Sequence, residues 1–152
     1  MVCAWDRVEA HAAARKLAAI AELARRSPEP EDQEFTADEL AYALAESRSR
    51  AGVLADLAQA LQDRLPGTMA AQLDGTVSRY KAEIVARATA LLDDAGARAA
   101  EGKVLDRAAR LTPGGLRAAI AAAVPGSRSC RVRARSTRSP ARPRDSPSAY
   151  AT

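Results

Sequence analysis

His11 is the only histidine of this 152-residue chain, and the chain contains no asparagine. A hydrolase or nuclease that holds its metal with histidines and also uses a histidine base needs at least two. The sequence therefore excludes that kind of metal centre within this chain. His11 lies between two alanines, where a solvated or packed imidazole is the simpler interpretation. We expect no metal, no cofactor and no catalytic residue.

The adjacent carboxylates Asp93 and Asp94 are the next candidates for chemistry, as ligands of Mg²⁺ or as an acid and base pair. No third acid or histidine stands at a spacing that would complete such a site. Aspartates at the start of a predicted helix more often cap its free backbone N–H groups. The glycines of "TPGGLR" lack the spacing and the Gly-Lys-Ser/Thr end of a phosphate loop. We therefore predict that the chain is not an enzyme.

Residues 37–61, "ADELAYALAESRSRAGVLADLAQAL", follow the spacing of a helix-turn-helix unit. Ala45 stands at the turn position where glycine would relieve a left-handed backbone. Arg48 and Arg50 begin the second helix and are candidate DNA contacts, although Asp56 and Asp63 follow them. A plain pair of antiparallel helices explains the same spacing, so both interpretations stay open.

A second basic pair lies in "SRYKAE", residues 78–83, where Arg79 and Lys81 flank Tyr80 at the start of a predicted helix. Cations at this position can contact nucleic-acid phosphates. A solvated helix face is the alternative. The candidate nucleic-acid contacts of the chain are therefore Arg48, Arg50, Arg79 and Lys81.

The charge of the chain is divided unevenly. Residues 1–125 hold 16 Lys/Arg and 18 Asp/Glu, a net charge of −2, whereas residues 126–152 hold seven Arg and one Asp, a net charge of +6. This Arg/Ser/Pro-rich tail contains no Leu, Ile, Phe or Met, so we expect it to be disordered.

No signal peptide or membrane span is recognisable, which predicts a cytoplasmic protein without a membrane partner. Cys3 and Cys130 are not expected to form a disulfide.

Apolar periodicity predicts an all-α, irregular domain of about seven helices over residues 1–125. Its first helix should bury Trp5, Val8, Ala12, Leu17, Ile20 and Ala24. Residues 27–35 should form an extended connector, and Thr36 with Glu39 a capping box. A third helix should bury Val53, Leu54, Leu57 and Leu61. The first two helices are predicted over residues 4–26 and 37–46. The third helix should end before "LPGT" (65–68), and that motif should cap a fourth helix that ends at Gly75. The fifth helix is predicted over 77–92, the sixth over 95–110 with a cap at Asp93 or Asp94, and the seventh from Thr112-Pro113 to Pro125.

Three stretches together suggest a relative: "WDRVEAHAAARKLAAIAELARR", "FTADELAYAL" and the whole of Leu65 to Val124. Within the last, Leu-Pro-Gly-Thr, Arg-Tyr-Lys-Ala and Leu-Thr-Pro-Gly-x-Leu-Arg occur in order. These blocks closely resemble the actinobacterial 13E12 repeat family, which is domain-of-unknown-function family 222. The resemblance implies a helical module that, in family members, usually precedes a C-terminal HNH endonuclease module. No residue of that nuclease has a counterpart here.

The resemblance is expected to end at Val124, where the composition changes. A frameshift after about codon 124 of a GC-rich gene would produce such an Arg-, Ala-, Pro- and Ser-rich tail. The alternative is a native basic arm that holds phosphates without sequence preference. The expected function is that of an isolated DNA- or partner-docking module without its nuclease. Its alternatives are an oligomerisation or regulatory domain that self-associates, and a truncated remnant without function. No small-molecule substrate is expected.

Overall fold

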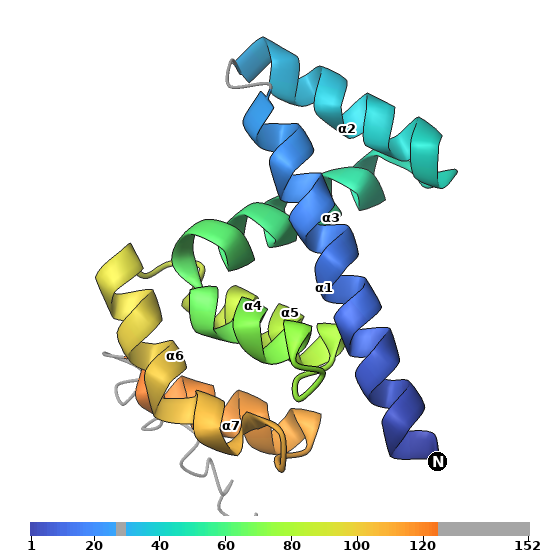
Figure 1. Cartoon of the computed structure of the whole chain (residues 1–152). Helices are drawn as coiled ribbons and strands as arrows, with labels where there is room; N and C mark the ends of the chain where they lie inside the picture. The colour runs from blue at the N-terminus through green and yellow to red at the C-terminus, as the bar shows by residue number, and fades with distance from the viewer. Residues whose placement is uncertain (27–29, 125–152) are drawn as a thin grey trace, which may run out of the picture.

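The computed structural model describes residues 1–26 and 30–124, and it describes side chains for 1–26 and 36–124. This part of the chain contains seven α-helices and one π-helical segment, and no strand, which confirms the all-α prediction. The elements in chain order (Figure 1) are α1 (Val2–Arg26), α2 (Pro30–Leu44), α3 (Arg48–Gln59), η1 (Ala60–Arg64), α4 (Pro66–Leu73), α5 (Arg79–Thr89), α6 (Asp94–Ala108) and α7 (Pro113–Ala123). The predicted stop at Pro125 and the tail 126–152 lie outside the described residues.

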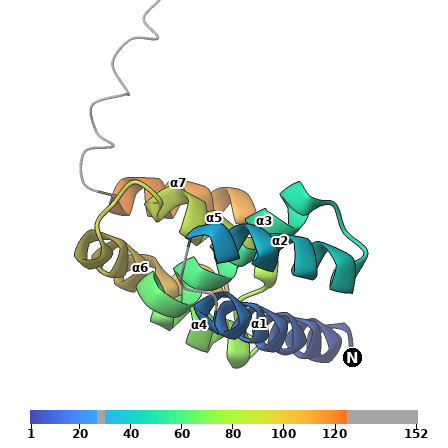
Figure 2. The ribbon, with the colours of Figure 1, turned by 90° about the horizontal axis from the view of Figure 1, so that it is seen from above.

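The helices form two groups that share a core. In the first, α3 packs against both α1 and α2; in the second, α7 packs against both α5 and α6. The short helix α4 joins the groups, because it contacts α1 on one side and α6 on the other. Figure 2 shows that α1 runs along one side of the molecule, so that one of its faces is turned away from the other helices.

Alanine occupies many of the contact positions. Ten alanines are among the buried residues of the described chain, beside larger side chains such as Leu17, Leu61 and Ile120. A buried alanine allows neighbouring helix backbones to approach closely, because its side chain fills little space. The buried alanines are Ala10, Ala14, Ala21, Ala24, Ala51, Ala58, Ala82, Ala97, Ala100 and Ala108.

The first helix forms as predicted, but its predicted buried face was partly wrong. Leu17, Ile20 and Ala24 are buried, as expected. Trp5, Val8 and Ala12 are exposed instead, and Ala10, Ala14 and Ala21 take the core positions of α1. The small side chains allow α1 to lie close against α3 and α4, and this close packing turns Trp5 and Val8 outward.

The predicted connector over residues 27–35 was also wrong, because α2 already begins at Pro30. Proline suits the first position of a helix, where its missing N–H has no intrahelical partner to lose. Thr36 and Glu39 therefore lie inside α2, and Thr36 is buried, so the predicted capping box does not form.

The "LPGT" motif begins α4 as predicted, but by another mechanism. Pro66 occupies the first turn, and Thr68 is buried within the helix rather than capping it. The cap comes from α6: the backbone N–H of Thr68 donates to Oε1 of Glu101 at 2.6 Å. Glu101 is 5% exposed, and a Cβ on Gly67 would lie 3.1 Å from its second carboxylate oxygen. The glycine therefore makes room for a carboxylate at the start of α4.

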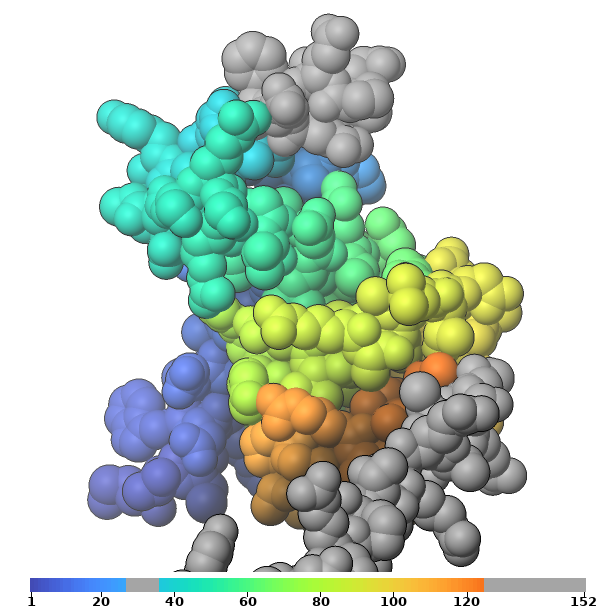
Figure 3. Space-filling view, turned by 180° about the vertical axis from the view of Figure 1, so that it is seen from behind, coloured from blue at the N-terminus to red at the C-terminus, as the bar shows by residue number. Residues whose placement is uncertain are grey.

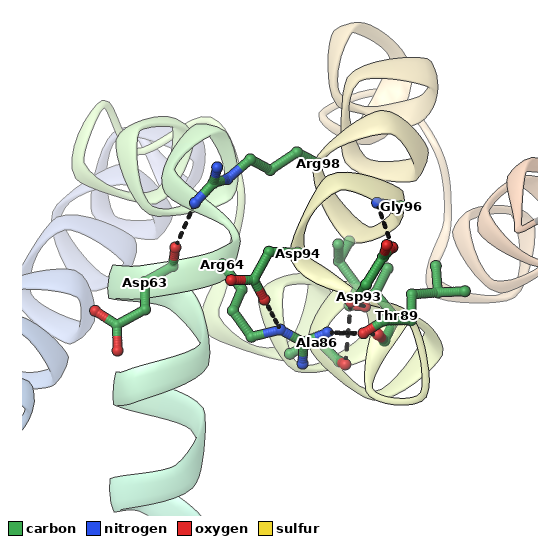
Figure 4. A network of polar contacts seen from close by, with 10 residues as sticks. Asp63, Arg64, Ala86, Thr89, Asp93, Asp94, Gly96 and Arg98 are labelled. Carbon is green, nitrogen blue, oxygen red and sulfur yellow. Dashed lines mark hydrogen bonds and ion pairs between the residues drawn. The ribbon is translucent and has the colours of Figure 1, made fainter.

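The third helix ends before "LPGT" as predicted, but its buried face and its last turn differ from an ordinary α-helix with the predicted face. Leu54, Leu57 and Leu61 are buried, whereas Val53 is 46% exposed, and the helix continues through the π-helical segment η1. Arg64 ends this segment and donates to the carbonyl oxygens of Thr89 and Leu92, at 3.1 and 2.5 Å (Figure 4). It therefore satisfies free carbonyl groups at the end of α5.

The remaining helix boundaries lie within two or three residues of the predicted ones. Asp93 caps α6 by accepting from the N–H of Gly96 at 2.8 Å, and Thr112 caps α7 with Pro113 in its first turn. Both caps confirm the sequence prediction. Gly75 follows α4 with a φ of 73°, and a Cβ there would lie 2.8 Å from the carbonyl oxygen of Arg7. Glycine is needed at this position both for its backbone conformation and for the close approach of α1.

Candidate nucleic-acid interface

The connection between α2 and α3 has the geometry of a tight helical turn. Three residues join the two helices, and Ala45 has a φ of 51°, in the left-handed region. The N–H of Glu46 donates to the carbonyl of Ala41 at 3.0 Å, and the N–H of Ala45 donates to the carbonyl of Tyr42 at 3.3 Å. This pair of hydrogen bonds is the Schellman arrangement, which usually has glycine at the left-handed position. The turn predicted at Ala45 is therefore present, with alanine in a glycine position.

Ser47 is the N-cap residue of α3. Its hydroxyl oxygen accepts from the N–H of Arg50 at 3.3 Å, which caps the helix. Arg48, Ser49 and Arg50 follow and are all exposed. On the opposite side of α3, Ala51 and Leu54 are buried and fix the helix to the core. Figure 3 shows the α2–α3 hairpin, in cyan and teal, at the opposite end of the molecule from α7.

An ion pair links the two arms of the hairpin. Nε of Arg48 lies 3.0 Å from Oδ1 of Asp38 on α2, and the two side chains are 57% and 56% exposed. An exposed pair of this kind contributes little to stability and exchanges readily with solvent. The side chain of Arg50 has no hydrogen-bond or ion-pair partner in the described part of the chain.

The hairpin surface carries further side chains that limit what it can bind. Tyr42, near the end of α2, is 93% exposed. Tyr42 is not among the residues predicted from the sequence, although it is an aromatic residue a few positions before two arginines. Beyond the first turn of α3, the exposed residues include Val53 and the acidic Asp56. Positive charge is therefore confined to the first turn, which suits contact with phosphates better than reading of bases.

The second predicted pair, Arg79 and Lys81, lies at the start of α5. Nζ of Lys81 donates to the carbonyl oxygens of Ala108 and Ala109, at 2.8 and 3.0 Å. These two bonds place a cation at the end of α6, where it stabilises the helix dipole. Arg79 pairs with Glu83, one turn further along α5, at 3.0 Å. Lys81 therefore connects α5 to the end of α6, while Arg79 is paired within α5 itself.

The surroundings of this second pair carry mixed charge. Arg79 and Lys81 line a cavity of about 450 Å³ between α1 and the turn before α5, together with Arg7 and with the acids Asp6 and Glu9. The four predicted cations thus occur as two pairs beside different helices, and the structure does not bring them together on one helix face. Arg48 and Arg50 are both exposed at the start of α3, and their contact with DNA stays a prediction.

The remaining candidates have structural roles. Nδ1 of His11 lies 2.6 Å from the carbonyl oxygen of Leu73, so the imidazole donates to the end of α4 and holds α1 against it. Asp94 pairs with Arg64 at 3.0 Å, while Asp93 is the cap of α6. Within residues 1–26 and 30–124, no three His, Cys, Asp or Glu side chains gather as a metal site would require.

Comparison with protein families identifies the class of protein. The model of the family "Domain of unknown function (DUF222)" matches residues 5–142, which is most of the chain. The chain therefore belongs to this family, which is the 13E12 repeat family expected from the sequence. Comparison with curated proteins and with solved structures gives no match.

The matched range extends 18 residues beyond Val124, where we expected the resemblance to end. The frameshift hypothesis thereby loses one of its two supporting observations, and the unusual composition of the tail remains as the other. No helix in the part of the chain that the structure describes has the length and apolarity that a membrane crossing requires.

Proposed function

We propose that this chain is a DNA-docking module, which binds the phosphate backbone through the first turn of α3. In this proposal the chain corresponds to the helical module of HNH endonuclease-like proteins, and it supplies no catalytic residue itself. The observation that carries the proposal is the α2–α3 turn, in which left-handed Ala45 and the Ser47 cap leave Arg48 and Arg50 exposed together. Helix-turn-helix proteins use the same combination of a short turn and an exposed second-helix start.

Three physical features favour phosphate as the ligand. The free N–H groups and the dipole of α3 place partial positive charge at its start. The two guanidinium groups of Arg48 and Arg50 add full charges in the same turn, and Arg forms paired hydrogen bonds to phosphate oxygens. The phenol of Tyr42 supplies a further donor at the end of α2, 93% exposed.

The charges around the hairpin set the expected strength of binding. Asp38, Glu39 and Glu46 lie on α2 and in the turn, so the two arginines do not dominate the local field. We therefore expect weak binding without sequence preference, with a dissociation constant on the order of 10⁻⁴ to 10⁻⁶ M at physiological salt. The arginine-rich tail can add a second contribution of the same kind.

The test compares two charge-matched double variants of the full chain, so that the tail contributes equally to both. Fluorescence anisotropy with a labelled DNA duplex gives the binding constant at several salt concentrations. The slope of log K against log [salt] is negative, and each lost phosphate contact reduces its magnitude by about 0.9. We expect R48Q/R50Q to reduce the magnitude of the slope by about 2, whereas R107Q/R110Q, which removes two exposed arginines at and just beyond the end of α6, should leave it unchanged.

Equal slopes for the two variants would contradict the proposal and would assign any binding to other parts of the chain. A third variant, R79Q, tests the second predicted pair by the same measurement. If the chain is a docking module without catalytic residues, we also expect the purified protein to leave supercoiled plasmid DNA intact in the presence of Mg²⁺. Metal-dependent nicking by clean protein would contradict the assignment as a docking module without catalysis.

A further inference from the structure

Helix α1 has a second apolar stripe that no described part of the chain covers. Trp5 is 68% exposed and Val8 is 55% exposed, and Ala12 and Ala19 are exposed as well. Met1 extends this stripe at the start of the chain and is fully exposed. Figure 3 shows the N-terminal half of α1, in blue, projecting beside the body of the molecule. A large exposed tryptophan in a row of apolar residues typically marks an interaction surface.

The stripe has the spacing of a helix-packing seam. Trp5, Ala12 and Ala19 are seven residues apart, and Val8 stands between the first two. Seven residues make about two helical turns, so these side chains lie on one line along α1. At about 100° per residue, this line lies roughly opposite the side that carries the buried Ala10, Ala14, Leu17 and Ala21. Helix α1 therefore has one seam for the core of its own domain and another that faces solvent.

We propose that the outer stripe of α1 is a self-association surface, on which α1 of a second copy packs in the antiparallel direction. A two-fold axis near Ala12 generates this arrangement. The small Ala12 side chains of both copies meet at the axis and allow close approach. Trp5 of each copy then lies over Ala19 of the other, which places a large side chain on a small one.

Charge complementarity favours a second copy of this chain as the partner that covers the stripe. Glu9 and Lys16 are also seven residues apart, so they lie on the same side of the stripe. In an antiparallel two-fold pair, the flank of one helix that carries Glu9 and Lys16 lies against the same flank of the other helix. Glu9 of each copy therefore meets Lys16 of the other. Neither residue has an ion-pair partner within the described chain. In a parallel two-fold pair, the flanks that carry Glu9 and Lys16 would lie on opposite sides of the interface, so this pair of charges would not meet.

The size of the surface sets the strength of the pair. A contact made by one helix from each copy is smaller than the 1,200–2,000 Å² that specific stable interfaces bury. We therefore expect a reversible dimer with a dissociation constant on the order of 10–100 µM. Self-association of this kind is independent of the DNA contact proposed above, because α3 and α1 carry the two surfaces separately.

Sedimentation equilibrium of the full chain tests the proposal, supported by fluorescence of Trp5, which is the only tryptophan. The average mass should rise from 16.0 kDa towards twice that value as concentration increases, with a blue shift of the emission as Trp5 becomes buried. W5A should weaken association at least 10-fold. L91A, which shortens a fully exposed apolar side chain outside the stripe, should leave association unchanged.

Exchange of charges tests the antiparallel register. E9K and K16E should each weaken self-association, because each places like charges opposite one another. An equimolar mixture of the two variants should associate, and E9K/K16E should recover the wild-type constant. A wild-type monomer at 1 mM would overturn the proposal, as would dimerisation that W5A or the charge exchange does not affect. Binding of a monomer to lipid vesicles through Trp5 would likewise overturn it, by assigning the stripe to a membrane surface.

Discussion

The left-handed backbone of Ala45 makes a stability prediction that tests the α2–α3 turn directly. Alanine at a φ of 51° brings its Cβ close to the following carbonyl oxygen, which costs roughly 1–2 kcal/mol. Ala45→Gly removes this repulsion. Glycine also gains freedom in the unfolded chain, which offsets about 0.5–1 kcal/mol of the benefit. The free energy of unfolding should therefore rise by about 0.5–1 kcal/mol.

The control is the same substitution at an ordinary helical position. Ala99 is exposed in the middle of α6, as Ala45 is exposed in the turn, so neither change removes a buried methyl group. Ala99→Gly should lower the free energy of unfolding by about 0.5–1 kcal/mol, because it only adds freedom to the unfolded chain. The two substitutions should thus shift stability in opposite directions.

Thermal and urea unfolding followed by circular dichroism measure both variants. For an ordered domain of this size, we expect Ala45→Gly to raise the midpoint temperature by about 2–4 °C, and Ala99→Gly to lower it by a similar amount. The urea slope should not change, since neither variant alters the buried area. Equal destabilisation by both glycines would refute the left-handed turn, and with it the geometric basis of the proposed DNA contact.

Three further substitutions test the contacts that join the helices, each by the same unfolding measurements. Glu101→Ala should lower stability by about 1–3 kcal/mol, because it leaves the N–H of Thr68 without its acceptor; Glu101→Gln keeps an acceptor oxygen and should cost less. Gly75→Ala should cost at least about 2 kcal/mol, since its Cβ would be forced into a left-handed backbone and against the backbone of Arg7. Arg64→Lys should cost about 1–2 kcal/mol, because an ammonium group cannot reproduce the fork that reaches two carbonyl groups and Asp94. A variant of any of the three with wild-type stability would show that the contact concerned does not hold the fold.

The sequence predicted those features of the candidate site that depend only on residues close to one another in the chain. The left-handed turn at Ala45 and the exposed pair Arg48 and Arg50 follow from residues within a few positions of one another. Lys81 looked equally suitable for phosphate contact, but its amine reaches the end of α6, which lies 27 residues further along the chain. No local pattern indicates such a partner.

The sequence by itself determined that the chain forms helices and where several of them begin. Asp93, Thr112 and Pro113 act on backbone groups one to three residues away, so their effect does not depend on the rest of the fold. The spacing of apolar residues likewise determined the all-α class. Family membership was readable in the same way, from short motifs kept in order.

Only the tertiary structure decided which side of α1 is buried and what caps α4. Both sides of α1 carry apolar residues at helical spacing, so periodicity alone could not choose between Trp5 and Ala10. The choice depends on how closely α3 and α4 approach, and small side chains permit the closest packing. The carboxylate of Glu101 reaches α4 only because the folded chain brings α6 alongside it, at a position where Gly67 leaves room.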